Sequence, residues 1–355
     1  MQRLIRPLRT AIKSPFISKP TYCLSSMMKQ NGHTSQVKPF TLVQPLISSF
    51  STDVPQHKNA LKSTYEASGY YVEQMLTGCL AIYSYYIESG DECIIVDPLF
   101  DTERYNELIK SRGKKLKGIF VSHYHADYVS GQYELQKKHQ CKIYMGPKAI
   151  SSDSVVSLKD KERIKLGKVE LECWHTPGHT EESSCLVVID DTGKRDTIFS
   201  GDTLFLNEVG RPDLAVKTTL SAEDLANLLH DSIEKLKTLN DDIRIYPGHG
   251  SGSSCGKSIG KGDFCTLGTQ KEKNYALKSS NKTQFVKQVL EDMPKPPPYF
   301  GYNAKLNKFE PFFYESAAKS VHKHLSIEDV YKYSKEKDIV ILDVRDTKDL
   351  KDGII

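Results

Sequence analysis

Residues 121–131 read Val-Ser-His-Tyr-His-Ala-Asp-Tyr-Val-Ser-Gly. They place His123, His125 and Asp127 at alternate positions, and imidazole nitrogens and carboxylates are common ligands of divalent metals. The apolar run 118–121 before them is typical of a buried strand, and residues 129–140 after them are compatible with a helix. Ligands at a strand-to-helix corner are held rigidly and point into one cleft. Paired histidines also occur on solvated surfaces, so this stretch alone does not establish a metal site.

Three later stretches show a similar pattern, in which an apolar run ends in a histidine or aspartate beside glycine or proline. They are Thr176-Pro177-Gly178-His179, Phe199-Ser200-Gly201-Asp202 and Tyr246-Pro247-Gly248-His249. Packing alone gives no reason for such a repetition. With residues 121–131, this ordered set resembles the metallo-β-lactamase superfamily over about residues 70 to 275. The resemblance implies an αββα sandwich with a metal cleft at one edge.

The chain has 355 residues, a length that favours two domains rather than one. Expected strands and helices alternate along its first large part, which favours sheets covered by helices. Residues 338–345 read as a buried strand ending in Asp-Val-Arg and resemble the opening of a rhodanese domain, but no cysteine follows Cys265. The expected fold class is α/β, an αββα sandwich followed by an incomplete rhodanese-like α/β segment. We expect a leader (1–55), a metallo-β-lactamase-like domain (68–280), an extension with a proline-rich linker (281–315) and a truncated rhodanese-like segment (316–355).

Charge is distributed unevenly between the first residues and the rest of the chain. Residues 1–52 contain seven Lys or Arg and no Asp or Glu, with Arg3, Arg6 and Arg9 spaced three apart. This composition is typical of a mitochondrial transit peptide, and a disordered tail without targeting function is the alternative. We therefore expect the mitochondrial matrix as the location. The rest of the chain has 42 basic and 45 acidic residues, which gives no support for nucleic-acid binding. No apolar run approaches the ~20 residues of a membrane span.

The residue after the H-x-H-A-D motif bears on the number of metals. Hydrolytic members of the superfamily, such as glyoxalase II, have a histidine there and hold two metals that activate a water. In this sequence the position is Tyr128, and a phenol with a pKa of about 10 is a poor metal ligand at pH 7. We expect Tyr128 to block the second metal site, and His249 alone not to restore it. The sequence therefore predicts one metal.

A single metal points to the persulfide dioxygenase branch of the superfamily. This resemblance implies one Fe²⁺ per chain, held by His123, His179 and Asp202 with open positions for substrate and dioxygen. It also implies that three further residues orient the ligands or bound water by hydrogen bonds. These are His125, Asp127 and His249.

Further motifs are similar to those of persulfide dioxygenases fused to a rhodanese domain: the aromatic Tyr128, a Cys-Gly-Lys loop at 255–257 and the proline-rich run 294–298. Cys255 in that loop is a candidate thiol for carrying persulfide, and a buried inert cysteine is the alternative. Arg211, in a Gly-Arg-Pro-Asp segment, could engage a substrate thiolate or carboxylate. Alternatively, it pairs with Asp213 and braces the loop.

The sequence thus favours an iron-dependent dioxygenase that oxidises glutathione persulfide, or a related persulfide, with O₂ to sulfite in mitochondrial sulfide oxidation. One alternative is a dinuclear zinc hydrolase of hydroxyacylglutathione thioesters, similar to glyoxalase II. Another is a non-catalytic protein that binds sulfide species. The expected partners are small molecules and O₂, with no nucleic acid and no membrane span. The sequence leaves open which thiol carries the sulfur and whether the chain forms a homo-oligomer.

Overall fold

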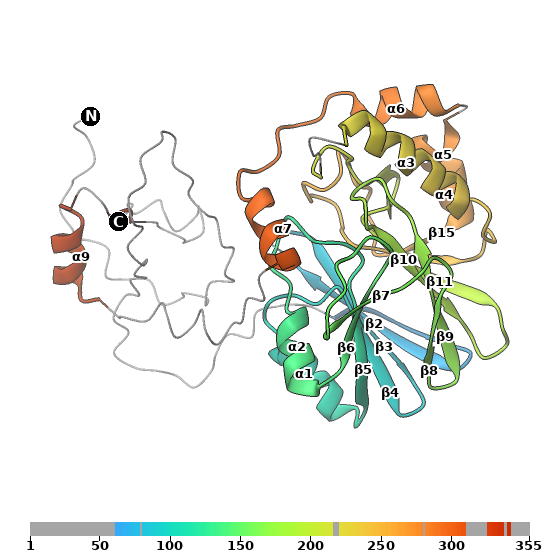
Figure 1. Ribbon diagram of the computed structural model, residues 1–355, viewed down its shortest axis with the longest axis horizontal. Helices are drawn as coiled ribbons and strands as arrows, with labels where there is room; N and C mark the ends of the chain where they lie inside the picture. The colour runs from blue at the N-terminus through green and yellow to red at the C-terminus, as the bar shows by residue number, and fades with distance from the viewer. Residues whose placement is uncertain are drawn as a thin grey trace. The chain divides into compact units, whose positions relative to one another are not determined.

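The computed structural model describes six ranges: residues 61–78, 80–215, 220–279, 281–309, 325–336 and 339–341. The first four ranges belong to one compact unit and the last two to a second (Figure 1). In the second unit, helix α9 (Ile327–Tyr333) has a capped start, in which Ser326 and Asp329 exchange hydrogen bonds. The expected leader and most of the expected strand at 338–345 lie outside the described residues.

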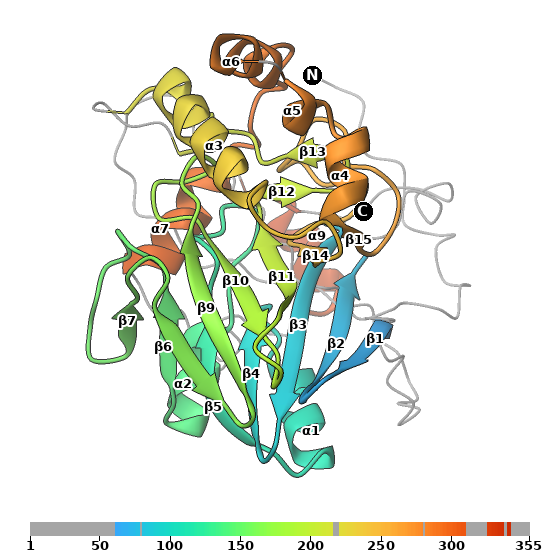
Figure 2. The ribbon, with the colours of Figure 1, turned by 90° about the vertical axis from the view of Figure 1, so that its right-hand side faces the viewer.

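Two β-sheets form the centre of the first unit (Figure 2). The first sheet has seven strands in chain order, antiparallel from β1 to β4 and parallel from β4 to β7. Its strands are β1 (Leu61–Ala67), β2 (Tyr70–Thr77), β3 (Ile82–Ser89), β4 (Glu92–Val96), β5 (Lys115–Phe120), β6 (Lys142–Met145) and β7 (Val155–Ser157). Strand β1 therefore lies before residue 68, where we expected the metallo-β-lactamase-like domain to begin.

The second sheet has the order β15-β14-β11-β10-β9-β8, with one parallel pair, β11 and β14. Its strands are β8 (Arg163–Leu166), β9 (Val169–His175), β10 (Ser184–Ile189), β11 (Arg195–Gly201), β14 (Arg244–Pro247) and β15 (Cys265–Thr266). A small hairpin of β12 (Leu204–Phe205) and β13 (Glu208–Val209) follows β11. This hairpin begins directly after Asp202 and Thr203 in the chain and contacts β11.

The two sheets share one apolar core, because neighbouring residues in a strand point to opposite faces. In β3, Tyr85 and Ile87 point to the core between the sheets, where they join Leu186 and Phe199 of the second sheet. Tyr86, between them in sequence, belongs to the cluster on the outer face. Strand β3 is buried along its whole length because both faces are covered.

Helices cover the outer faces of both sheets. The first sheet packs against α1 (Glu103–Ser111) and α2 (Gln132–His139), and the second against α3 (Ala222–Leu236), on which α6 (Lys282–Leu290) packs in turn. The expected αββα sandwich is therefore confirmed. The other helices described in this unit are α4 (Leu267–Lys273), α5 (Tyr275–Lys278) and α7 (Phe300–Phe309). Among the described residues, no helix is both long and apolar enough to cross a membrane.

Helix α2 starts at Gln132, three residues after the expected start at Val129. Ser130 forms an isolated bridge with Leu99, and its backbone N–H donates to Oδ1 of Asn307 at 2.9 Å. These partners hold Ser130 outside the helix, and the local sequence gives no sign of them.

Candidate metal centre

Four strand ends deliver the motif residues to one place. His123 follows β5, His179 follows β9, Asp202 follows β11 and His249 follows β14, and each side chain is at most 2% exposed. Backbone hydrogen bonds fix the last of these ends, because Gly248 N–H donates to Gly201 O and Tyr83 N–H to Gly248 O, both at 2.8 Å. The expected convergence of the four motifs is thus observed.

The three residues expected to bind metal form one donor group. Oδ2 of Asp202 lies 3.4 Å from Nε2 of His179 and 3.8 Å from Nε2 of His123. One ligand atom from each of the three residues lies within 4.8 Å of the others. Two imidazoles and one carboxylate in this arrangement are a common triad for non-haem iron, and they also accept zinc or manganese.

Three other buried residues form a second donor group: Asp127, His249 and Cys255. Nε2 of His249 lies 3.4 Å from Oδ2 of Asp127 and 3.5 Å from Oδ2 of Asp202. Asp202 therefore lies between the two groups. Spacing within the sequence had not indicated that Cys255 joins Asp127.

Unpartnered polar atoms at both groups fit a bound cation. Nε2 of His123, both ring nitrogens of His249 and both carboxylate oxygens of Asp127 and Asp202 are buried without a hydrogen-bond partner. Burying a neutral polar group without a hydrogen-bond partner costs on the order of 2–7 kcal/mol, and burying an ionised carboxylate in this way costs more. A metal ion that accepts these lone pairs removes that cost, so the residues fit metal binding.

Hydrogen bonds set the orientation of two histidine rings. Nδ1 of His179 lies 2.9 Å from the backbone oxygen of Arg211, which can only accept, so this nitrogen carries the proton. Nδ1 of His123 lies 2.9 Å from Oγ of Ser122. Both contacts leave Nε2 free to bind a metal, as is usual when a second partner holds a ligand histidine.

Asp97, which directly follows β4, holds His125. Its Oδ1 lies 3.0 Å from Nε2 of His125 and accepts the backbone N–H of Ser122 at 2.8 Å. Asp97 adopts a left-handed backbone with φ of 50°, a conformation that costs energy in residues other than glycine and is common at functional sites. An Asp-Pro pair directly after a buried strand was the signal in the sequence.

Asn307 of α7 holds the motif loop from about 180 residues away in sequence. Its Nδ2 donates to the backbone oxygens of His125 at 2.7 Å and Tyr128 at 2.8 Å, and its Oδ1 accepts from Ser130 N–H. Asn307 lies in the extension that follows the proline-rich run, so this extension supports the metal loop. No local pattern in the sequence identified it.

Arg211 takes the bracing role that the sequence left as one of two alternatives. Its guanidinium forms a two-pronged pair with Asp213, with N–O distances of 2.8 and 2.6 Å, and donates to the backbone oxygens of Ser254 and Pro294. The Arg211 side chain is 1% exposed. Arg211 therefore links its own loop to the Cys255 loop and to the proline-rich run. Asp213 neutralises its charge.

Tyr128 packs in the wall of the site. Its ring centroid lies 4.4 Å from that of His125, its hydroxyl donates to Asp97 O at 3.3 Å, and Ile82 and Leu99 surround it. Neither donor group contains Tyr128 or His125, although Nδ1 of His125 is buried and unpartnered.

The metal-free side chains influence one another's protonation. Burial and the neighbouring His125 lower the pKa of His123. Burial also opposes protonation of His249, but the nearby carboxylates, Asp202 first and Asp127 with it, raise the His249 pKa. Burial raises the pKa of Cys255, which is 1% exposed and packs with Phe205, Ile259 and Phe300. Without a metal, Cys255 is therefore a buried thiol, as one of the two alternatives held.

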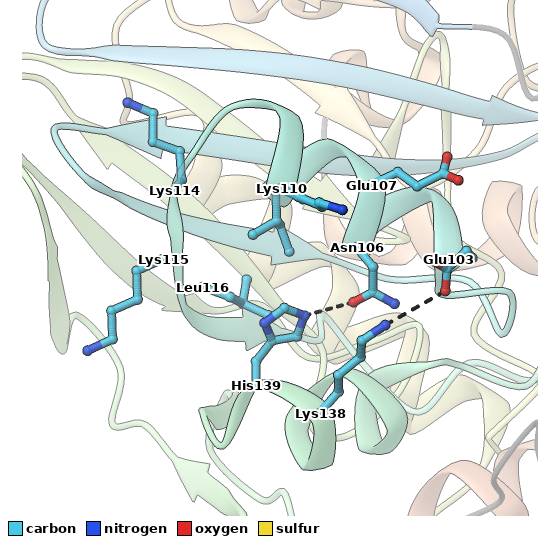
Figure 3. A pocket seen from close by; sticks show the side chains of 10 residues that line it. Glu103, Asn106, Glu107, Lys110, Lys114, Lys115, Leu116, Lys138 and His139 are labelled. Carbon is cyan, nitrogen blue, oxygen red and sulfur yellow. Dashed lines mark hydrogen bonds and ion pairs between the residues drawn. The ribbon is translucent and has the colours of Figure 1, made fainter.

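A hollow of about 690 Å³ opens elsewhere on the first sheet, lined by α1, the start of β5 and the end of α2 (Figure 3). His139 and Asn106 meet across it at 2.7 Å. His123 follows the opposite end of β5, and none of the residues of the two donor groups lines this hollow.

Comparisons with known proteins agree with this geometry. A sequence profile of the Metallo-beta-lactamase superfamily matches residues 77–249. The probable polyketide biosynthesis zinc-dependent hydrolase PksB of Bacillus subtilis is 30% identical over 185 residues, which are 50% of this chain and 76% of PksB. A hydroxyacylglutathione hydrolase of Tolumonas auensis is 32% identical over 172 residues, 47% of this chain and 60% of that protein.

Two solved structures share the sandwich. A metallo-beta-lactamase from Staphylococcus aureus superposes with a TM-score of 0.64 and 30% identity, covering 69% of this chain and 74% of its own. ETHE1 from Myxococcus xanthus has a TM-score of 0.56 and 21% identity, covering 67% and 97%, which shows the fold alone. With its histidine and aspartate motifs at four strand ends, this chain belongs to the metallo-β-lactamase superfamily.

Proposed function

We propose that this protein is a persulfide dioxygenase with one Fe²⁺ per chain, bound by His123, His179 and Asp202. The observation that carries the proposal is the separate two-histidine, one-carboxylate donor group. Three protein ligands of this kind leave positions open at non-haem iron for two further reactants. Tyr128 and the Cys-Gly-Lys loop at 255–257 add the sequence resemblance to that branch of the superfamily.

The proposed reaction converts R-S-SH, O₂ and water into R-SH, sulfite and two protons, with glutathione persulfide as the default substrate. When bound, ferrous iron supplies the redox chemistry that joins dioxygen to sulfur. The chain's own residues do the positioning. Ser122 and the Arg211 carbonyl orient the two ligand rings, and Asp97 holds His125.

Burial of the site is the second contribution of the chain. The ligand side chains are at most 2% exposed, and the apolar side chains of Phe205, Ile259 and Phe300 pack together near them around Cys255. A dry site strengthens each electrostatic interaction within it and protects a reactive persulfide from side reactions.

A dinuclear zinc thioester hydrolase is the second candidate. The names of the curated relatives favour it, since PksB is described as a zinc-dependent hydrolase and others as hydroxyacylglutathione hydrolases. The second donor group also offers a place for another metal. The sequence position that carries histidine in the hydrolytic pattern is Tyr128, which weighs against this candidate.

Metal analysis and oxygen uptake separate the candidates. We expect protein purified without oxygen to contain about one iron per chain and to consume O₂ with glutathione persulfide, releasing sulfite. His179→Asn should lose iron and oxygen uptake, and His230→Asn on α3, whose ring packs against Phe285, serves as the control. Two zinc ions per chain, thioester hydrolysis and no oxygen uptake would overturn the proposal. If the metal-loaded protein shows neither oxygen uptake nor thioester hydrolysis, the result would favour a non-catalytic binding protein.

A further inference from the structure

The hollow between α1 and α2 has the size of a site for a small molecule. Its volume is about 690 Å³, within the range of about 300 to 1,000 Å³ that is usual for such sites. The buried side chains of Ile109 and Leu116 form the apolar part of its lining. The hollow is separate from the candidate metal centre, since neither donor group contributes a residue to it.

Basic side chains outnumber acidic ones in this hollow. Burial and the neighbouring Lys138 lower the pKa of His139, so its ring is uncharged at pH 7. The last turn of α1 and the carbonyl end of α2 carry partial negative charge, which offsets part of the excess but not all of it. The charged residues of the lining are four lysines and two glutamates: Lys110, Lys114, Lys115, Lys138, Glu103 and Glu107.

Two of these lysines are available to a ligand. Nζ of Lys114 donates to Gly90 O at 2.8 Å, and Nζ of Lys138 lies 3.7 Å from Oε2 of Glu103. Within the described part of the chain, the ammonium groups of Lys110 and Lys115 have neither an ion pair nor a hydrogen bond. The hollow therefore offers positive charge that the protein itself does not neutralise.

Asn106 adds a buried hydrogen-bond donor to the lining. Its Oδ1 lies 2.7 Å from Nε2 of His139, and because an amide oxygen only accepts, Nε2 carries the proton. This contact leaves the amide nitrogen on the other side, and Figure 3 shows it turned away from His139. Asn106 is 8% exposed, and its Nδ2 has no hydrogen-bond partner among the described residues. A buried donor without an acceptor is costly, so an oxygen atom of a ligand would stabilise it.

The ion pair of Glu103 and Lys138 lies beside this amide. Glu103 and Asn106 are three residues apart on α1 and share one face of the helix, and their partners Lys138 and His139 are consecutive on α2 (Figure 3). The paired side chains are 67% and 52% exposed, and such exposed pairs contribute little stability. An anionic ligand can therefore replace the Glu103 carboxylate at Lys138 and reach the amide nitrogen of Asn106.

We propose that the hollow between α1 and α2 binds a small organic dianion, a compound with a phosphate group or two carboxylates. Its oxygens accept from the amide of Asn106 and from the lysine ammonium groups, and its carbon part packs on the apolar lining. The site lies outside the proposed dioxygenase reaction, in which none of these residues takes part. Its test therefore succeeds or fails independently of that function.

Isothermal titration calorimetry of the full, metal-loaded chain at low ionic strength tests the site. Phenyl phosphate and glutarate are the probes, and they distinguish a phosphate ligand from a dicarboxylate. We expect at least one probe to bind with one equivalent per chain. The double variant Lys110→Gln/Lys115→Gln should weaken this binding at least fivefold, because it removes the two unpaired charges. Asn106→Asp replaces the donor by a carboxylate and should weaken it at least tenfold.

Two matched variants make the same changes of charge elsewhere. Lys165→Gln/Lys168→Gln alters two exposed lysines near the turn between β8 and β9, and Asn227→Asp alters α3. Both should bind the probe as the wild type does, and all four variants should keep the wild-type metal content. Absence of binding by both probes would overturn the proposal. Binding that is equal in wild type and Lys110→Gln/Lys115→Gln would also overturn it, since the probe would then occupy the metal centre or another surface.

Discussion

Asp202 sits at the point where the two donor groups meet. Its carboxylate is fully buried, yet the positive charge of nearby His249 and His123 outweighs burial and lowers its pKa well below the ordinary value. A methyl group on Gly248 would lie 2.4 Å from Oδ1 of Asp202, so only glycine leaves room for this carboxylate. The nearby histidines thus favour the ionised, negatively charged form of the Asp202 carboxylate.

Asp97 offers a residue-scale prediction about ligand orientation. Asp97→Ala removes the acceptor that holds His125 and Ser122, so we expect iron affinity to fall on the order of 10- to 100-fold. Competition with a chelator measures the change. Asp97→Asn keeps an acceptor oxygen and tolerates the left-handed backbone, so it should recover most of the affinity. Asp153→Ala, at an exposed position, is the control, and equal affinity in Asp97→Ala and wild type would refute the assigned role.

At the scale of elements, helix α7 acts on a loop far from it in sequence. Asn307→Asp replaces the donating amide by a carboxylate facing the backbone oxygens of His125 and Tyr128. We expect a loss of stability on the order of 2–4 kcal/mol and a weaker first metal site, because the loop is pushed out of position. Thermal unfolding and chelator competition measure the two effects.

Asn303→Asp is the matched control for this prediction, since Asn303 is equally buried on the same helix. It should lower stability without the same loss of metal affinity. If both variants lose affinity in proportion to their loss of stability, α7 supports only the fold and not the loop.

Strand β9 carries a second element-scale prediction through Glu172, whose side chain is 2% exposed. Burial opposes its ionisation, but hydrogen bonds from Arg195, Trp174 and Arg163 outweigh burial and lower its pKa from 4.5 to about 2. A lowered pKa contributes stability above the unfolded value, and this contribution is lost as the pH falls through the folded value. Glu172 therefore ties β9 to its neighbours at neutral pH.

Glu172→Gln should lower the free energy of unfolding at pH 7 by on the order of 2 kcal/mol, a figure discounted because both arginines are partly exposed. The difference from wild type should shrink between pH 4.5 and about 2. Denaturant unfolding across pH measures it. Glu170→Gln, on the same strand with an exposed carboxylate, should change little. A difference for Glu172→Gln that is constant with pH would contradict the electrostatic explanation.

At the scale of the whole molecule, the alternating strand and helix patterns predicted sheets covered by helices. The αββα sandwich itself was implied by the family resemblance that the four motifs carry. The helix at Ser221 was predictable because Ser221 and Asp224 form its capping box locally. The roles of Asp97, Asn307 and Cys255 depend on contacts between distant segments, such as Asn307 with His125. The local sequence marked Asp97 and Cys255 but not the contacts that they make, and no local pattern marked Asn307.

The last prediction concerns residues 1–55, which we propose direct the protein to the mitochondrial matrix. They contain seven basic residues before the first acid, Asp53, with Arg3, Arg6 and Arg9 spaced three apart. A reporter fused after these residues should enter mitochondria and become protected from external protease, because the inner-membrane potential draws a positively charged segment inward. Replacing Arg3, Arg6 and Arg9 by Gln should reduce import at least several-fold. A reporter that stays in the cytosol, or equal import of the Gln variant, would favour a tail without targeting function.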